Sequence, residues 1–109
     1  MRNGLSLGLV LLLVVAVPAL AAGKGDAVAG KTLFASKCAS CHGASGEGKD
    51  AIAKMFKVEM KHLGSKEVQA KSDAELKKGI TEGSGKMRPV KLSDDEAANV
   101  IAFVRTLKK

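Results

Sequence analysis

The sequence predicts a small all-α protein, and three observations carry that prediction. Two stretches, Ser72–Glu75 and Ser93–Glu96, have the Ser-x-x-Glu pattern of a capping box, which marks the first turn of a helix. Beyond the apolar leader, the chain has none of the alternating or β-branched apolar runs that are typical of strands. The roughly 88 residues that follow the leader are enough for one domain with a modest core. About four short helices are expected, and each is justified in turn below.

The first 21 residues resemble a secretory signal peptide. The start carries one positive charge, an apolar run follows over residues 5–17, and small residues end the segment. We expect cleavage after Ala21 or Ala22, which leaves a domain over residues 22–109 in the periplasm. An uncleaved anchor is the alternative, but an apolar run of about 13 residues is shorter than the roughly 20 that span a bilayer. We therefore expect no stable membrane insertion after cleavage.

The first helix is expected to run from an Asp26 cap to about Lys37. Ala27, Gly30 and Phe34 share one face of this helix. Glycine inside a helix costs about 1 kcal/mol relative to alanine, so Gly30 indicates that another backbone comes close there. A neutral surface glycine is the alternative interpretation.

Three more helices are expected, near residues 51–56, from 73 to about 82, and from 93 to about 108. Glycine-rich polar loops at 43–50 and 83–89 separate them. The last helix has a continuous apolar stripe with Phe103 at its edge. The stripe consists of Ala97, Val100, Ile101, Val104 and Leu107.

The stretch Cys38-Ala39-Ser40-Cys41-His42 predicts a covalent attachment site for one haem c. Residues three apart lie on one face of a helical turn, so Cys38 and Cys41 can form thioethers with two vinyl groups on one porphyrin edge. His42 is then close enough to bind the iron from one side. The haem would also stabilise a small domain that has only three aromatic residues.

Three other uses of the cysteine pair fit the sequence less well than haem attachment. A thioredoxin-like dithiol expects a βαβ context, which this sequence does not show. Zinc expects four ligands, whereas only two cysteines and two histidines are present. A structural disulfide fits an exported protein but leaves His42 without a role.

Met87 is the first candidate for the second axial ligand of the iron. It lies in a loop bounded by glycines and Pro89, far along the chain from His42, so this loop can cover the opposite face of the haem. The alternatives are Met55, Met60 and His62. The two methionines lie in an apolar segment where packing explains them, and His62 is expected at the surface.

With these features the chain resembles the small bacterial class I cytochromes c. The resemblance extends from Asp26 to Leu107, and it implies that the first and last helices cross, with Gly30 and Phe34 packed near Phe103. It also implies thioethers at Cys38 and Cys41 and axial ligands at His42 and Met87. Members often have a proline shortly after the histidine. Its absence here leads us to expect a backbone carbonyl within residues 48–51 as the acceptor for the His42 Nδ1 proton.

The expected function is one-electron transfer by a soluble exported carrier, as in respiratory chains, and not enzymatic catalysis. A haem with both axial positions filled has no open site for substrate, so we expect no catalytic residues. The alternatives are a sensor or peroxidase-like protein with an open distal site, and a thiol–disulfide redox protein.

The net charge of +7 bears on partners. Lys37, Lys86 and Arg88 flank the two loops that should border the haem edge. We therefore expect redox partners, membrane-bound or periplasmic, with acidic docking surfaces. Nucleic acid is not expected, because no stacking aromatics are interleaved with the lysines. We expect the protein to be a monomer.

Overall fold

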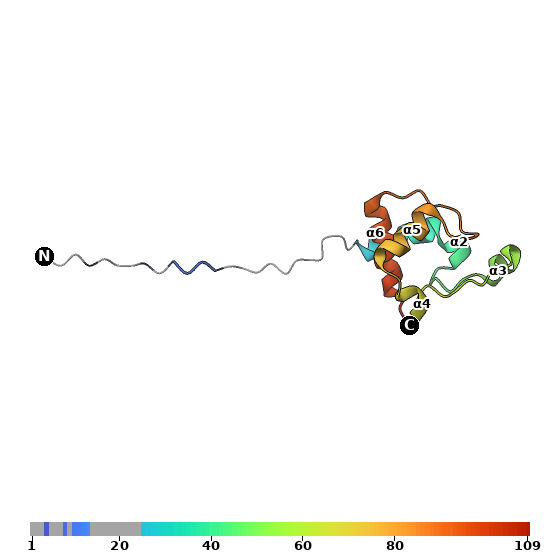
Figure 1. The fold of residues 1–109 in the computed structure, drawn as a ribbon, viewed down its shortest axis with the longest axis horizontal. Coiled ribbons are helices and arrows are strands. Elements are labelled where there is room, and N and C mark those ends of the chain that lie inside the picture. The colour runs from blue at the N-terminus through green and yellow to red at the C-terminus, as the bar shows by residue number, and fades with distance from the viewer. Residues whose placement is uncertain (1–3, 5–7, 9, 14–24) are drawn as a thin grey trace.

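The computed structural model describes residues 4, 8, 10–13 and 25–109. Most of the predicted signal peptide and its cleavage position lie outside these residues. Among the described residues, no helix is both long enough and apolar enough to cross a membrane. The helices are α1 (Ala27–Lys37), α2 (Ala39–His42), α3 (Asp50–Phe56), α4 (Lys66–Gln69), α5 (Asp73–Glu82) and α6 (Asp94–Thr106) (Figure 1).

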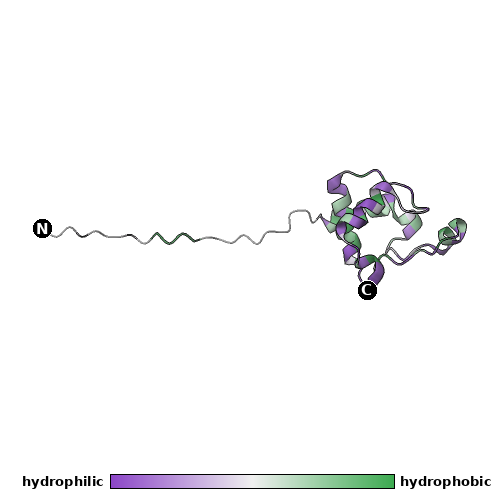
Figure 2. Cartoon of the chain, in the orientation of Figure 1, coloured by the Kyte–Doolittle hydropathy of each residue, from purple (hydrophilic) through white to green (hydrophobic). Residues whose placement is uncertain are grey.

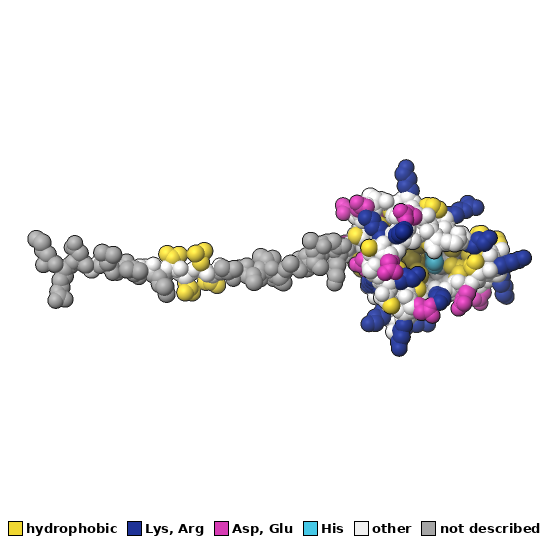
Figure 3. Space-filling view, in the orientation of Figure 1, with side chains coloured by type: hydrophobic (Ala, Val, Ile, Leu, Met, Phe, Trp, Pro, Cys, Tyr) yellow, Lys and Arg dark blue, Asp and Glu magenta, His cyan; other side chains and the backbone are white. Residues whose placement is uncertain are grey.

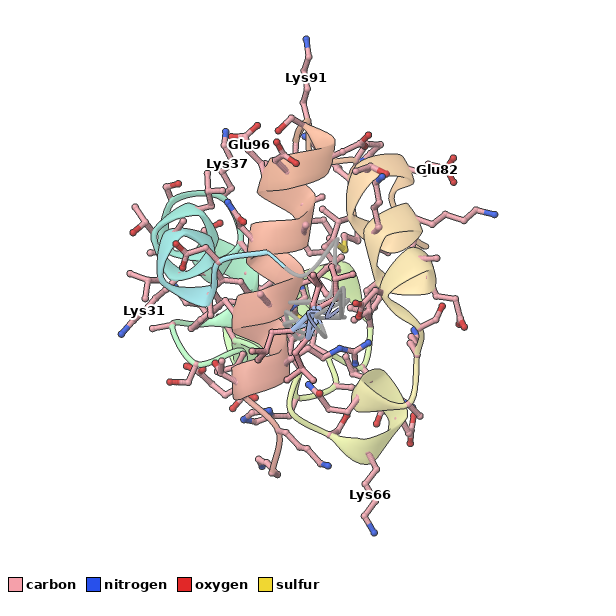
Figure 4. All side chains as sticks on the ribbon, turned by 90° about the vertical axis from the view of Figure 1, so that its left-hand side faces the viewer. Lys31, Lys37, Lys66, Glu82, Lys91 and Glu96 are labelled. Atoms are coloured by element: carbon pink, nitrogen blue, oxygen red, sulfur yellow. The ribbon has the colours of Figure 1, made fainter. Side chains whose placement is uncertain are left out.

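The close packing of α1 against α6 organises the fold. Figure 4 shows α6 between α1 and α5. A Cβ atom added to Gly30 would lie 1.8 Å from the carbonyl oxygen of Asn99, so only glycine allows the two helices to approach this closely. The phenyl rings of Phe34 and Phe103 meet across this contact with centroids 5.0 Å apart and planes tilted by 55°. The predicted crossing and the predicted reason for Gly30 are both confirmed.

The apolar stripe of α6 supplies most of the core. Phe34 and Val100 are its most deeply buried large side chains, and Cys38 and Val104 complete the cluster with Phe103. Phe103, expected at the edge of the stripe and against Phe34, is buried in the core because α1 covers it. Figure 2 shows hydrophobic and hydrophilic residues along each of the larger helices, as expected for helices with one buried face.

Both predicted capping boxes are present. Ser72 begins α5 by accepting from the backbone N–H of Glu75, and Ser93 begins α6 by accepting from that of Glu96. The first helix begins at Asp26, whose carboxylate accepts from the backbone N–H groups of Val28 and Ala29. The sequence therefore placed three helix starts correctly.

The four-residue helix α4 was not predicted. Ser65 caps it and Val68 is its buried residue. The Gln69 side chain donates to the carbonyl oxygens of Leu63 at 2.9 Å and Val104 at 3.0 Å, which ties this segment to α6. A helix this short is held by such contacts and not by its own sequence, because one turn cannot offset the cost of helix nucleation.

The short helix α3 agrees with the prediction, but its surroundings differ from those of the other helices. None of its residues is buried, and Met55 is 64% exposed. It ends at Lys57, which has the left-handed conformation (φ +54°) that favours glycine. Figure 1 shows α3 at the end of a projection, apart from the other helices.

Candidate haem attachment site

The stretch from Cys38 to His42 forms one helical turn. Cys38 ends α1 and begins α2, and its carbonyl oxygen accepts from the backbone N–H of Cys41 at 3.3 Å and of His42 at 3.0 Å. The two cysteines are not joined by a disulfide. The helical turn places Cys38 and Cys41 three residues apart, the spacing at which side chains share a face, and His42 follows directly.

The two thiols differ in their surroundings. Cys38 is buried in the core cluster beside Phe34 and Phe103, whereas Cys41 is half-buried. Burial raises the pKa of the Cys38 thiol above its ordinary value, although Lys37 opposes this effect. A buried thiol with a raised pKa is a poor nucleophile at neutral pH, so Cys38 lacks the depressed pKa of a reactive redox thiol.

His42 is the one residue of the turn with an unmet hydrogen-bonding atom. Its Nδ1 atom is buried and has no hydrogen-bond partner among the described residues. The carbonyl acceptor expected within residues 48–51 is therefore not found. Burial lowers the pKa of the His42 imidazole, which favours the neutral form that binds metals. A half-buried imidazole whose neutral form is favoured fits the role of an iron ligand.

The loop after His42 folds back onto the helical turn. The N–H of Gly48 donates to the carbonyl oxygen of His42 at 2.6 Å, and the N–H of Lys49 donates to that of Cys41 at 3.1 Å. Gly43, Gly46 and Gly48 all have positive φ values, which explains why this loop needs several glycines. The loop thus fixes the backbone next to the histidine.

Met87 lies in a separate tight turn after α5. Its N–H donates to the carbonyl oxygen of Ser84 at 2.8 Å, and its own carbonyl accepts from Ser84 N–H at 3.1 Å. The Val90 N–H donates to the Ile80 carbonyl at 2.8 Å, so the turn is anchored on α5. In the view of Figure 1 this loop extends on the same side of the molecule as α2. Met87 is half-buried.

The other axial candidates occupy different environments. Met55 is exposed on α3, so packing does not explain it as expected. Met60 lies against Gly48, where an added Cβ would be 3.1 Å from the methionine Cβ. His62 is half-buried rather than at the surface, and its Nδ1 accepts from the Gly64 N–H at 2.8 Å within a local turn. One of its two nitrogens thus has a structural partner.

On the face drawn in Figure 3, one histidine side chain is visible beside hydrophobic side chains on the α3 side of the molecule. Within the described residues, no group of three or more His, Cys, Asp or Glu side chains is assembled in a way that could hold a metal ion. The donor set that zinc requires is therefore not formed in this part of the chain.

Two cysteines and a half-buried imidazole on one turn, in a helical protein whose first and last helices cross, define the class of c-type cytochromes. The donor chemistry fits haem, because thiols can form thioethers and the imidazole can bind iron. The comparisons with known proteins agree. The family model described as cytochrome c matches residues 27–108. The chain belongs to the cytochrome c family.

Individual relatives support this assignment. Cytochrome c-554(547) of Halothiobacillus neapolitanus is 38% identical over 90 residues, which cover 77% of this chain and 99% of that protein. The solved c-type cytochrome KustC0563 is similar in structure, with a TM-score of 0.63 and 30% identity, over 73% of this chain and 98% of that one. Cytochrome CL of Methylophaga aminisulfidivorans has a TM-score of 0.58 and 29% identity, over 74% and 52%.

The family settles four of the sequence predictions. The all-α class I cytochrome c fold is confirmed, as is the resemblance on which it was based. The chain carries covalently attached haem c, and its activity is haem-based electron transfer. The particular residues that hold the haem remain predictions.

Proposed function

We propose that this protein is an exported one-electron carrier with a single haem c. Cys38 and Cys41 would hold the haem through thioethers, and His42 and Met87 would be the axial ligands. One observation carries the proposal: the two cysteines and a half-buried imidazole, whose buried Nδ1 has no hydrogen-bond partner among the described residues, lie on one helical turn at the edge of the core. When bound in this way, haem supplies reversible one-electron oxidation and reduction, and a thioether ligand favours the ferrous state.

The chain's own residues would hold the haem ligands in fixed positions. The α1–α6 crossing fixes Cys38, because this residue is buried in the same core cluster as Phe34 and Phe103. The backbone bonds of the following loop fix His42. A rigid ligand set favours electron transfer, since little reorganisation accompanies the change of charge. No acid–base group is needed for this activity, so we propose no catalytic residue and no enzymatic role.

Met87 is proposed as the second ligand on the basis of its turn. The Ser84–Met87 hydrogen bonds and the Val90–Ile80 bond hold this methionine in a defined position on α5. Met55 is less suitable because it is exposed on α3. His62 is less suitable because its Nδ1 already accepts a hydrogen bond.

The proposed redox partners are periplasmic or membrane proteins with acidic surfaces. Lys37, Lys86 and Arg88 are all exposed. Figure 3 shows basic side chains around much of the helical part of the molecule, and Figure 4 shows Lys37 beside Glu96. Exposed cations at these positions would raise the rate of association more than the affinity. The apolar leader with small residues at 19 and 21 supports export to the periplasm after cleavage.

Intact mass and absorption spectra of the exported protein test the proposal. One added haem per cleaved chain is expected, with a ferrous spectrum that changes little when carbon monoxide is added. A mass equal to the bare cleaved chain would contradict covalent attachment. A large spectral change with carbon monoxide would instead favour an open distal site, as in a sensor or peroxidase-like protein.

A matched pair of variants tests the distal ligand. The Met87→Ala variant should bind carbon monoxide readily and have a lower reduction potential, because the thioether that favours ferrous iron is lost. The Met55→Ala variant is the control and should leave both properties unchanged. Equal responses from the two variants would exclude Met87 as the ligand.

A further inference from the structure

The carboxylate of Glu47 has an unusual place in the loop that follows His42. Its Oε2 atom accepts from the backbone N–H of Ser45 at 2.9 Å. Hydrogen bonds from its own N–H and from Ser45 N–H lower the pKa of the Glu47 carboxyl below its ordinary value of 4.5. The side chain is therefore ionised at neutral pH and folded back onto its own loop, although the residue is exposed.

The carboxylate also rests directly on Gly43, the residue after His42. A Cβ atom added to Gly43 would lie 2.3 Å from Oε1 of Glu47 and 2.7 Å from Oε2. Gly43 itself has φ +81°, a conformation in which other L residues are strained. The missing side chain thus makes room for the glutamate, and the two residues are complementary.

This loop controls the backbone of the attachment turn. Its far end is bonded to the carbonyl oxygens of Cys41 and His42 through the N–H groups of Lys49 and Gly48. Its middle is held from outside, because the Leu63 N–H donates to the Gly46 carbonyl at 2.9 Å. The loop has no proline to restrict its backbone, so hydrogen bonds must fix its shape.

We propose that Glu47 is a positioning residue for His42. Its carboxylate closes the loop by binding Ser45 N–H and covering Gly43, and the closed loop holds the backbone from which the imidazole projects. The inference rests on the proposed role of His42 as an iron ligand. Glu47 would act through the loop and would touch neither the haem nor the iron.

The test compares three variants of the haem-loaded protein. Glu47→Ala removes the acceptor, Glu47→Gln keeps an oxygen that can accept from Ser45, and Glu59→Ala removes an exposed carboxylate elsewhere. Two measurements are made: amide hydrogen exchange at Ser45 and Gly48, and the proton NMR resonances of the His42 ring that ferric iron shifts. Ring resonances report the orientation of the imidazole, which a change in overall stability alone would not move.

The expected result is graded. Glu47→Ala should accelerate exchange at Ser45 and Gly48 several-fold and shift the His42 ring resonances. Glu47→Gln should stay close to the wild type in both measurements, and Glu59→Ala should match the wild type. Unchanged ring resonances in Glu47→Ala, or an equal shift in Glu59→Ala, would overturn the proposal.

Two controls keep the interpretation clear. If the wild type shows no iron-shifted imidazole resonances that disappear in His42→Ala, then His42 is not a ligand and the proposed function itself fails. If those resonances are present but do not respond to Glu47→Ala, only the role of Glu47 fails.

Should Glu47→Ala not retain haem, Glu47→Asp replaces it, because the shorter side chain draws the carboxylate away from Ser45. Glu47→Asp should then give larger changes than Glu47→Gln in both measurements. Ring resonances identical to those of the wild type would overturn the proposal.

Discussion

The α1–α6 crossing and the α3 projection are built from similar residues but are stabilised in different ways. The crossing buries Phe34, Val100 and Phe103 and has a capped helix on each side. In α3 no residue is buried, and the cap residue Lys49 makes no side-chain hydrogen bond to the helix. Both regions contain apolar side chains, so hydrophobic composition alone does not distinguish them.

The difference shows where the free energy of folding resides. Side chains of α1 and α6 contact each other across the core, and this contact removes apolar surface from water, which stabilises the folded state. The α3 helix is held through the chain on either side of it, as shown by its position in Figure 1. Changes in the crossing should therefore affect global unfolding strongly, while changes in α3 should affect it weakly.

The largest effect is expected from Phe34→Ala. This side chain is only 2% exposed and contacts the Phe103 ring, so its loss leaves a cavity in the core. Urea unfolding of the haem-loaded protein should show a loss of about 3–5 kcal/mol. Val28→Ala on the same helix is the control, because Val28 is 79% exposed and its change should fall within about 0.5 kcal/mol. Similar losses in the two variants would contradict the proposed core.

Two glycines inside helices should respond in opposite directions to alanine. Gly30→Ala places a Cβ against the Asn99 carbonyl and should lower the free energy of unfolding by about 2–3 kcal/mol. Gly79→Ala on α5 meets nothing within 4 Å and should raise it by about 0.5–1 kcal/mol. Thermal unfolding followed by circular dichroism measures both. A stabilised Gly30→Ala variant would show that α1 and α6 are not in such close contact.

A smaller effect on stability is expected from the helix caps, which differ between α6 in the crossing and α3 in the projection. Ser93→Ala removes the acceptor for the Glu96 N–H and should cost about 1 kcal/mol in global stability. Lys49→Ala removes no cap bond from α3 and should change stability by less than about 0.5 kcal/mol. Denaturant midpoints of the two variants provide the comparison, and a Lys49→Ala loss as large as that of Ser93→Ala would remove the distinction.

The smallest effect is expected on the pH dependence of stability. The pKa of Glu96 is lowered by hydrogen bonds to the Ser93 backbone and side chain, and that of Asp94 by the Lys77 side chain. Both carboxylates are thus stabilising above their ordinary pKa values of 4.5 and 3.8, and this contribution is lost as the pH falls through the lower folded values. Unfolding curves measured between neutral and acidic pH should show stability falling below about pH 4.5. The fall should be shallower in Ser93→Ala, and an identical pH dependence would exclude a role for this cap.

Local signals in the sequence determined the helix starts and the attachment turn. The carboxylate of Asp26 and the serines at 72 and 93 cap their own helices, because each bonds to a backbone N–H only two or three residues away. Cys38, Cys41 and His42 likewise lie within five consecutive residues of the sequence. Such interactions depend on a few neighbouring residues, so the sequence alone was sufficient.

Only the tertiary structure decided the features that depend on distant partners. The helix α4 forms because Gln69 bonds to Leu63 and Val104, and Phe103 is buried because α1 lies over it. The place of Glu47 over Gly43 also required the folded loop, in which three glycines take positive φ values. In each case the free energy comes from groups brought together by folding, and no pattern in the neighbouring residues records it.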